Sequence, residues 1–146
     1  MTFMEFNLAI MRDPVLGQLL PMQFRRTYPR LSLEGTTLCA SFIGFRIAPR
    51  GNGIFAFPPA YYLKITYPDC RLLSYEKIPA SSDAAGHTMM PRTQQEIKRL
   101  AELCDVVLKL YDEKVDNLET ALAQYSTLLN TVLEPDQLMI LDQFGG

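Results

Sequence analysis

The sequence predicts an α+β fold, in which an antiparallel β-meander of four to six strands precedes a long C-terminal helix or a helical hairpin with heptad spacing. Three observations predict it. Residues 1–78 are rich in proline, glycine and strand-like alternation, residues 79–92 form a polar, loop-like stretch, and residues 93–146 place apolar residues at helical spacing. Because 146 residues suit a single domain, we expect the helical part to bury apolar surface against the β part.

Near the N-terminus, apolar side chains alternate with smaller or polar ones, in the order Phe6, Asn7, Leu8, Ala9 and Ile10. This alternation predicts a first strand, with a short helix as the alternative. Asp13 and Pro14 follow, and they are typical of a helix cap and a first helical position. We therefore expect a helical turn or two before Pro21.

Strand signals are strongest in the middle of the chain. Residues 38–47 are mostly apolar, and a loop rich in Pro and Gly separates them from a short strand over residues 54–57. The clearest hairpin pairs residues 61–67 with residues 71–77 across a turn that contains Pro and Asp. The side chains that alternate with the apolar ones predict a sheet face open to solvent, and they are Tyr62, Lys64 and Thr66.

The C-terminal part begins with Thr93 and Glu96, which form a capping-box pattern. Apolar residues then follow at steps of four and three: Ile97, Ala101, Cys104, Leu108, Tyr111, Val115, Leu118, Leu122, Tyr125, Leu129 and Val132. One helix over residues 94–133 would be about 60 Å long and would outrun a body of this size. The alternative is a helical hairpin that turns between Asp112 and Asn117. After Pro135, a short terminal element is expected to dock back on the body.

The residue content argues against several kinds of site. A net charge of −2 is unlike that of a protein that binds nucleic acid mainly through phosphates. One His and three scattered cysteines offer no metal-ligand cluster, and we expect no cofactor and no catalytic residue. Cys70 falls in the predicted turn, where it could meet His87 with Asp83 beside the ring, but no motif requires that pairing.

The three cysteines, Cys39, Cys70 and Cys104, are odd in number and show no CxxC spacing, which indicates reduced thiols in a cytoplasmic protein. No apolar run reaches the roughly 18 residues that a membrane-spanning helix needs. We therefore expect no membrane association.

We expect a non-catalytic interaction or assembly module, such as an adaptor, a chaperone or an inhibitor-type binder, that acts through its helical apolar stripe. Its contacts with a protein partner or a second copy are predicted at Leu118, Leu122, Tyr125 and Leu129. One alternative is a small apolar-ligand-binding domain or small enzyme with an aromatic pocket between sheet and helix. Another is an RNA-binding module that uses the basic stretch of Arg25, Arg26, Tyr28, Arg30, Arg46 and Arg50.

Overall fold

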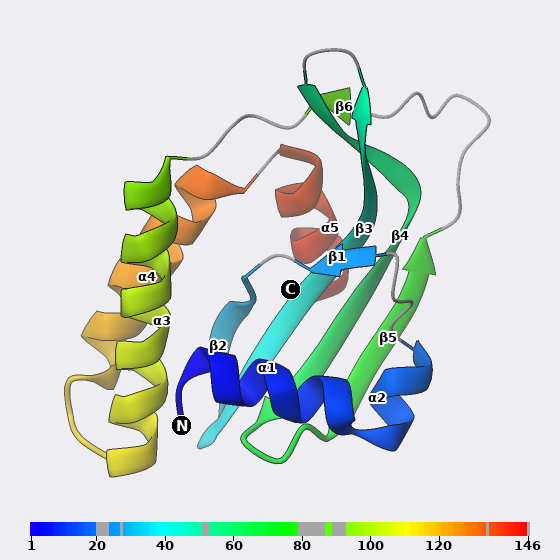
Figure 1. Cartoon of the computed structure of the whole chain (residues 1–146). Coiled ribbons are helices and arrows are strands. Elements are labelled where there is room, and N and C mark those ends of the chain that lie inside the picture. The colour runs from blue at the N-terminus through cyan, green and yellow to red at the C-terminus, as the bar shows by residue number, and fades with distance from the viewer. Residues whose placement is uncertain are drawn as a thin grey trace.

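A computed structural model describes residues 1–19, 24–26, 28–50, 53–78, 87–88, 93–133 and 135–145. The elements follow in the order α1 (Phe3–Arg12), α2 (Pro14–Leu19), β1 (Phe24–Arg26), β2 (Arg30–Glu34), β3 (Thr37–Arg50), β4 (Gly53–Tyr67), β5 (Leu72–Ile78), β6 (His87–Thr88), α3 (Gln94–Glu113), α4 (Leu118–Val132) and α5 (Pro135–Gly145). This α+β order, with the helices α3, α4 and α5 after the sheet, confirms the predicted fold class (Figure 1).

The strands form one antiparallel sheet with the path β1-β3-β4-β5, while β2 pairs with β3 and β6 pairs with β4. Strands β3, β4 and β5 are neighbours both in sequence and in space, as a meander requires. The predicted hairpin is therefore confirmed. At its turn, the amide of Cys70 donates to the carbonyl of Thr66 at 3.0 Å.

Helices cover both faces of this sheet, which the sequence pattern did not predict. On one face, the Phe6 ring of α1 lies 5.0 Å from the ring of Tyr67. On the other, the Phe144 ring of α5 lies 5.7 Å from that of Tyr62, and Figure 1 shows α1 and α5 on opposite sides of β3 and β4. Tyr62 is fully buried and donates to the Ser41 hydroxyl at 3.0 Å. The expected open face was wrong because a hydroxyl with a partner can be buried at little cost.

The first element is a helix, so the predicted strand was wrong and the alternative was right. Thr2 and Glu5 form a capping box at its start, since the Glu5 amide donates to the Thr2 hydroxyl at 3.2 Å. Phe6 and Ile10, four residues apart, are buried on the same side, and Leu8 faces away from them. Helix α2 then begins as predicted, and the Asp13 carboxylate accepts from the Leu16 amide at 3.0 Å.

The C-terminal helices form a hairpin, so the single long helix was wrong. Helix α3 ends at Glu113 and is capped by Lys114, whose φ of 56° is left-handed, and α4 begins at Leu118. Two of the predicted core positions, Ile97 and Val115, are 46% and 39% exposed. The connection between the helices, residues 114–117, has four residues, about as many as one helical turn, so it does not shift the phase of the apolar spacing. The sequence spacing of four and three therefore continues across a point where the chain reverses.

The helical hairpin packs along the side of the sheet that carries β2. The hydroxyl of Tyr111 in α3 donates to the carbonyl of Thr36 at 3.1 Å. From α4, the Tyr125 hydroxyl donates to the carbonyl of Pro29 at 2.5 Å. Figure 1 shows α3 and α4 side by side next to β2, with the first turn of α1 close to α3. The hydrophobic core includes residues of α1, of the hairpin and of the sheet, and it extends to Tyr62 and to Leu141 of α5.

Candidate interaction surfaces

Helix α1 carries a second apolar face that points away from the core. Met4, Leu8 and Met11 on α1 and Val15 on α2 are 74%, 41%, 61% and 58% exposed. We call these four residues the α1 stripe. They follow at steps of four, three and four residues, so the three on α1 lie in one line along the helix. Phe6 and Ile10 occupy the opposite side of the same helix and are buried.

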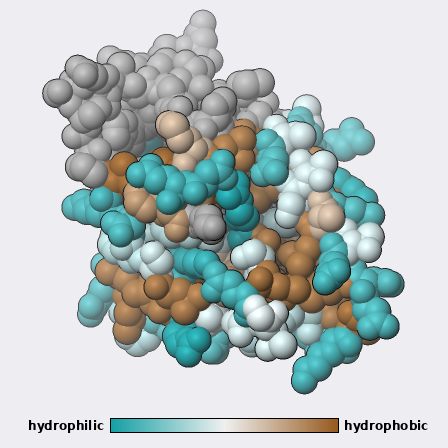
Figure 2. Space-filling view, turned by 180° about the vertical axis from the view of Figure 1, so that it is seen from behind, coloured by the Kyte–Doolittle hydropathy of each residue, from teal (hydrophilic) through white to brown (hydrophobic). Residues whose placement is uncertain are grey.

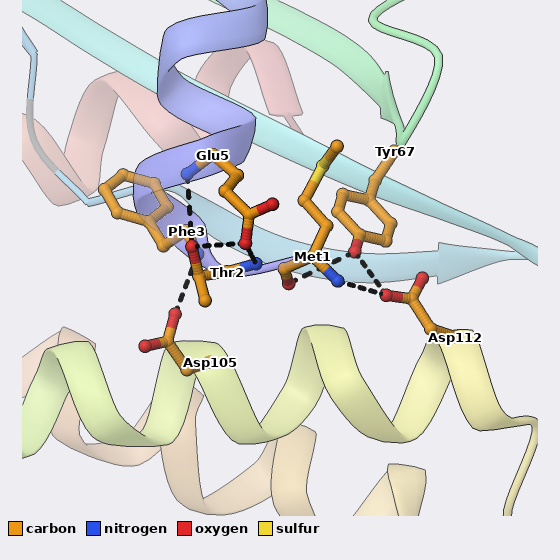
Figure 3. A network of polar contacts seen from close by, with 7 residues as sticks. All are labelled: Met1, Thr2, Phe3, Glu5, Tyr67, Asp105 and Asp112. Atoms are coloured by element: carbon orange, nitrogen blue, oxygen red, sulfur yellow. Dashed lines mark hydrogen bonds and ion pairs between the residues drawn. The ribbon is translucent and has the colours of Figure 1, made fainter.

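A polar network fixes the first turn of α1 to α3 and to the sheet, and Figure 3 shows how its members converge. The Met1 amino group lies 2.7 Å from the Asp112 carboxylate. The same carboxylate accepts from the Tyr67 hydroxyl at 2.8 Å. About two turns away along α3, the Phe3 amide donates to the Asp105 carboxylate at 2.7 Å. Asp105 therefore supplies, from α3, a partner for one of the free amides at the start of α1.

The electrostatics of this network suit a structural role. Burial raises the pKa of Tyr67, and its hydrogen bond to Asp112 raises that pKa further. The hydrogen bond to Asp112 likewise raises the pKa of the Met1 amino group. At neutral pH the network therefore holds a protonated phenol and an ammonium group around one carboxylate. This combination positions α1 and provides no activated base or nucleophile.

A second anchor holds the middle of α1. Arg26 of β1 donates from Nη2 to the Asn7 side-chain oxygen at 2.5 Å. Its guanidinium carbon lies 5.3 Å from the centre of the Phe42 ring, within range of a cation–π contact. The polar network holds the first turn of α1, and Arg26 holds its middle through Asn7. The α1 stripe is therefore held in a fixed orientation.

We expect replacement of Asp105 with alanine to lower the free energy of unfolding by about 1.5–3 kcal/mol, the usual range for a hydrogen bond to a charged group. The physical reason is that the Phe3 amide loses its acceptor in a partly buried position. Urea unfolding followed by circular dichroism measures the change. Asp116→Ala, in the exposed connection between α3 and α4, is the control. Equal stability of the two variants would contradict the anchor.

The helical hairpin carries a shallow groove of about 480 Å³ between α3 and α4. Its apolar lining comes from Leu103 and Leu128, Arg99 stands beside them, and small side chains of α4 complete it, including Ala123, Thr127 and Thr131. Arg99 lies 3.7 Å from Glu102 one turn further along α3, so its charge is partly compensated. The groove lies between two helices and not between sheet and helix, where the sequence suggested an aromatic pocket.

The four residues predicted to contact a partner lie on α4, and the hairpin turns them toward the chain's own core. Tyr125 and Leu129 are 0% and 1% exposed. Leu118 and Leu122 are partly buried and pack against the same core. In this arrangement they join α4 to the rest of the chain.

The α1 stripe was not predicted because the alternation of Phe6, Leu8 and Ile10 indicated a strand in this region. The spacing of Met4, Leu8, Met11 and Val15 was nevertheless visible in the sequence.

The grouping of Cys70, His87 and Asp83 that the sequence offered lies partly outside the described residues. Asp83 lies outside the described residues, and of His87 only the backbone, in β6, is described. Arg30 pairs with Asp142 at 2.9 Å, so two arginines of the basic stretch, Arg26 and Arg30, have partners within the chain. In the part of the chain that the structure describes, no group of three His, Cys, Asp or Glu side chains is placed to hold a metal ion.

All three cysteines are free and buried, Cys70 included. Burial raises the pKa of each thiol, and for Cys104 it raises the pKa to about 12. We expect none of the three to react with a thiol reagent at pH 8 until the protein unfolds, because both access and thiolate are lacking. Absorbance with Ellman's reagent, with and without guanidinium, measures this. Met139→Cys supplies an exposed thiol as the positive control; rapid reaction of a native cysteine would contradict the burial.

Stability should fall as the pH rises above 9. The Cys104 thiol has an ordinary pKa of 9.0 in the unfolded chain and a pKa of about 12 in the folded one. Between these values the unfolded state loses a proton that the folded state keeps, so unfolding becomes more favourable. The urea midpoint, measured from pH 7 to pH 11, should decline above pH 9. It should decline less in Cys104→Ala; equal slopes would assign the effect to other groups.

Among the described residues, no helix is both long and apolar enough to cross a membrane. Figure 2 shows the face opposite to that of Figure 1, where hydrophobic patches lie between hydrophilic side chains. No protein-family model, no curated protein and no solved structure matches this chain.

Proposed function

We propose that this protein is a non-catalytic interaction module of the reducing cytoplasm, and that the α1 stripe is its binding surface. One observation carries the proposal: α1 is apolar on two opposite sides, and the part of the chain that the structure describes buries the side with Phe6 and Ile10 and leaves the other side exposed. An exposed apolar patch on a folded protein often marks a site where another molecule binds. The exposed side of α1 therefore has the character of an interface that a second chain completes.

The side chains of the stripe suit protein binding. Met4 and Met11 are flexible and polarisable, and such side chains adapt to the shape of a partner. Covering one Leu, Met or Val side chain completely contributes roughly 1.5–3 kcal/mol, so the four together can drive a stable association. The anchors at Asp105, Asp112 and Arg26 reduce the ordering that binding would otherwise require.

Three buried free thiols support the cytoplasmic part of the proposal, because a reducing compartment keeps such thiols unpaired. The non-catalytic part is supported by the polar network at Met1, Tyr67 and Asp112, whose protonated phenol and ammonium group serve to hold α1.

The experiment is photo-crosslinking in cells that express the full chain. A photoreactive amino acid at position 11 should give an adduct of discrete mass, and Leu8→Glu in the same chain should abolish it. The matched control is position 139, where an equally exposed methionine lies on α5; its products should not respond to Leu8→Glu. If position 11 gives no adduct, or one that Leu8→Glu leaves unchanged, the α1 stripe is not a binding surface.

A further inference from the structure

Building on the proposed function, we infer that the occupant of the α1 stripe is a second copy of this chain, docked so that the two α1 helices pack antiparallel about a two-fold axis. The pattern of apolar and charged residues on the outer side of α1 carries the inference. Figure 1 shows α1 lying across the outside of the sheet, where another helix can approach it.

The stripe has the spacing of a coiled-coil seam. Steps of four and three residues between Met4, Leu8 and Met11 are those of alternating core positions in a heptad. Phe6, at the position furthest from such a seam, is the residue buried in the chain's own core. The outer side of α1 is therefore shaped to pack against one more helix, while the inner side remains on the sheet.

The charges beside the stripe are self-complementary. Glu5 directly follows Met4, and Arg12 directly follows Met11, so both lie on the same flank of the stripe, seven residues apart. In an antiparallel pair this flank meets the same flank of the other helix in reverse. Glu5 of each copy then faces Arg12 of the other, and two-fold symmetry makes the ion pair twice. A parallel pair would not bring these two residues together.

Both charged groups are available for this contact. Arg12 is exposed in the last turn of α1. Glu5 uses Oε1 in the capping box with Thr2, and hydrogen bonds from Thr2 lower the pKa of its carboxyl, so it is ionised at neutral pH. The midpoint between residues 5 and 12 lies next to Leu8. The two-fold axis therefore passes beside the central residue of the stripe, and the whole length of α1 is used.

The first test is the mass of the full chain in solution, by size exclusion with light scattering. We expect twice 16.6 kDa for the unmodified chain and 16.6 kDa for Leu8→Glu, with unchanged circular dichroism because this side chain points outward. Glu5→Gln, which keeps the capping box, and Arg12→Gln should each raise the dimer dissociation constant about fivefold to tenfold. The double variant should be no weaker than either single one, since the same two symmetry-related ion pairs are lost in each case. Lys109→Gln on α3 is the charge-matched control.

The second test separates the two orientations. In an antiparallel pair, Leu8→Cys places two thiols beside the axis, and mild oxidation should give a covalent dimer. Met4→Cys places its two thiols about 13 Å apart along the helices, beyond the roughly 7 Å between Cα atoms that a disulfide tolerates. Cross-linking of both variants would show a parallel pair and overturn the proposal. The native cysteines are buried and should not interfere.

The outcomes distinguish this inference from the proposed function. A chain that remains monomeric at every concentration, while position 11 still yields an adduct with a different protein, would overturn the second copy and leave the α1 stripe as a binding surface. A monomer that gives no adduct at position 11 would overturn both. A dimer that Leu8→Glu leaves intact would place the interface elsewhere and overturn the inference.

Discussion

Replacement of Tyr125 with alanine is expected to lower the free energy of unfolding by roughly 3–5 kcal/mol, the range for removal of a buried aromatic side chain. Tyr125 lies on α4 with none of its surface exposed. Its hydroxyl donates to the carbonyl of Pro29 just before β2, across 96 positions of sequence. The alanine variant would lose both the ring packing and this hydrogen bond, which together join the helical hairpin to the sheet.

Tyr125→Phe separates the two contributions. It keeps the ring and removes the hydroxyl, so the carbonyl of Pro29 loses its donor in a buried position, which costs about 1–3 kcal/mol. Gln124→Ala, at the adjacent exposed position of α4, is the control and should be nearly neutral. Urea unfolding of the three variants gives the comparison. A stable Tyr125→Ala protein that had instead lost a binding partner would return this residue to the role that the sequence predicted for it.

The helix starts and the β-hairpin could be predicted from the sequence, because each depends on residues that are close together along the chain. Asp13 caps the start of α2, and Thr93 with Glu96 caps the start of α3. Such caps could be predicted because a capping side chain bonds only to amides in the first turn of its own helix. The hairpin of β4 and β5 was visible from its alternation and its turn. These features required no knowledge of what lay across the molecule.

Features that depend on distant parts of the chain were not predicted. Tyr62 belongs to a face that would be open to solvent if α5 did not return to cover it. The chain reverses after Lys114 because α4 packs beside β2. The four-residue connection leaves the apolar spacing the same for one long helix and for a hairpin, so the spacing could not distinguish them. Which side of α1 is buried could not be derived from its sequence, because both sides are apolar.

The same ambiguity explains why the surface that we propose lies on α1, whereas the sequence pattern indicated α4. Leu122 and Leu8 both belong to stripes with a spacing of four and three. Only the fold shows that the chain itself covers the first and leaves the second exposed. A pattern of this kind predicts that a helix face will be covered, and the fold decides whether the same chain or another one covers it.

Substitution of Gly44 by alanine should be the most damaging single-methyl change in the sheet. Gly44 of β3 stands opposite Tyr61 of β4 in the register. The Tyr61 ring lies directly over the glycine, so an added Cβ would come within 2.0 Å of Cζ and 2.2 Å of Cε1. Because the ring is buried, it cannot turn outward without loss of its packing. We expect a loss of about 3 kcal/mol, at the upper end of the usual range for overpacking.

Two comparisons make this prediction specific to the contact between Gly44 and Tyr61. Gly17→Ala, in α2, meets only the carbonyl oxygen of Met11 at an ordinary 3.7 Å and should be neutral or slightly stabilising. The double variant Gly44→Ala with Tyr61→Ala should be less destabilised than the sum of the two single variants, because removal of the ring makes room for the methyl group. Thermal and urea unfolding of the four proteins give the coupling free energy. If the two single effects simply add, the methyl group acts through the backbone, and the close approach of the ring to Gly44 is not what limits the residue at this position.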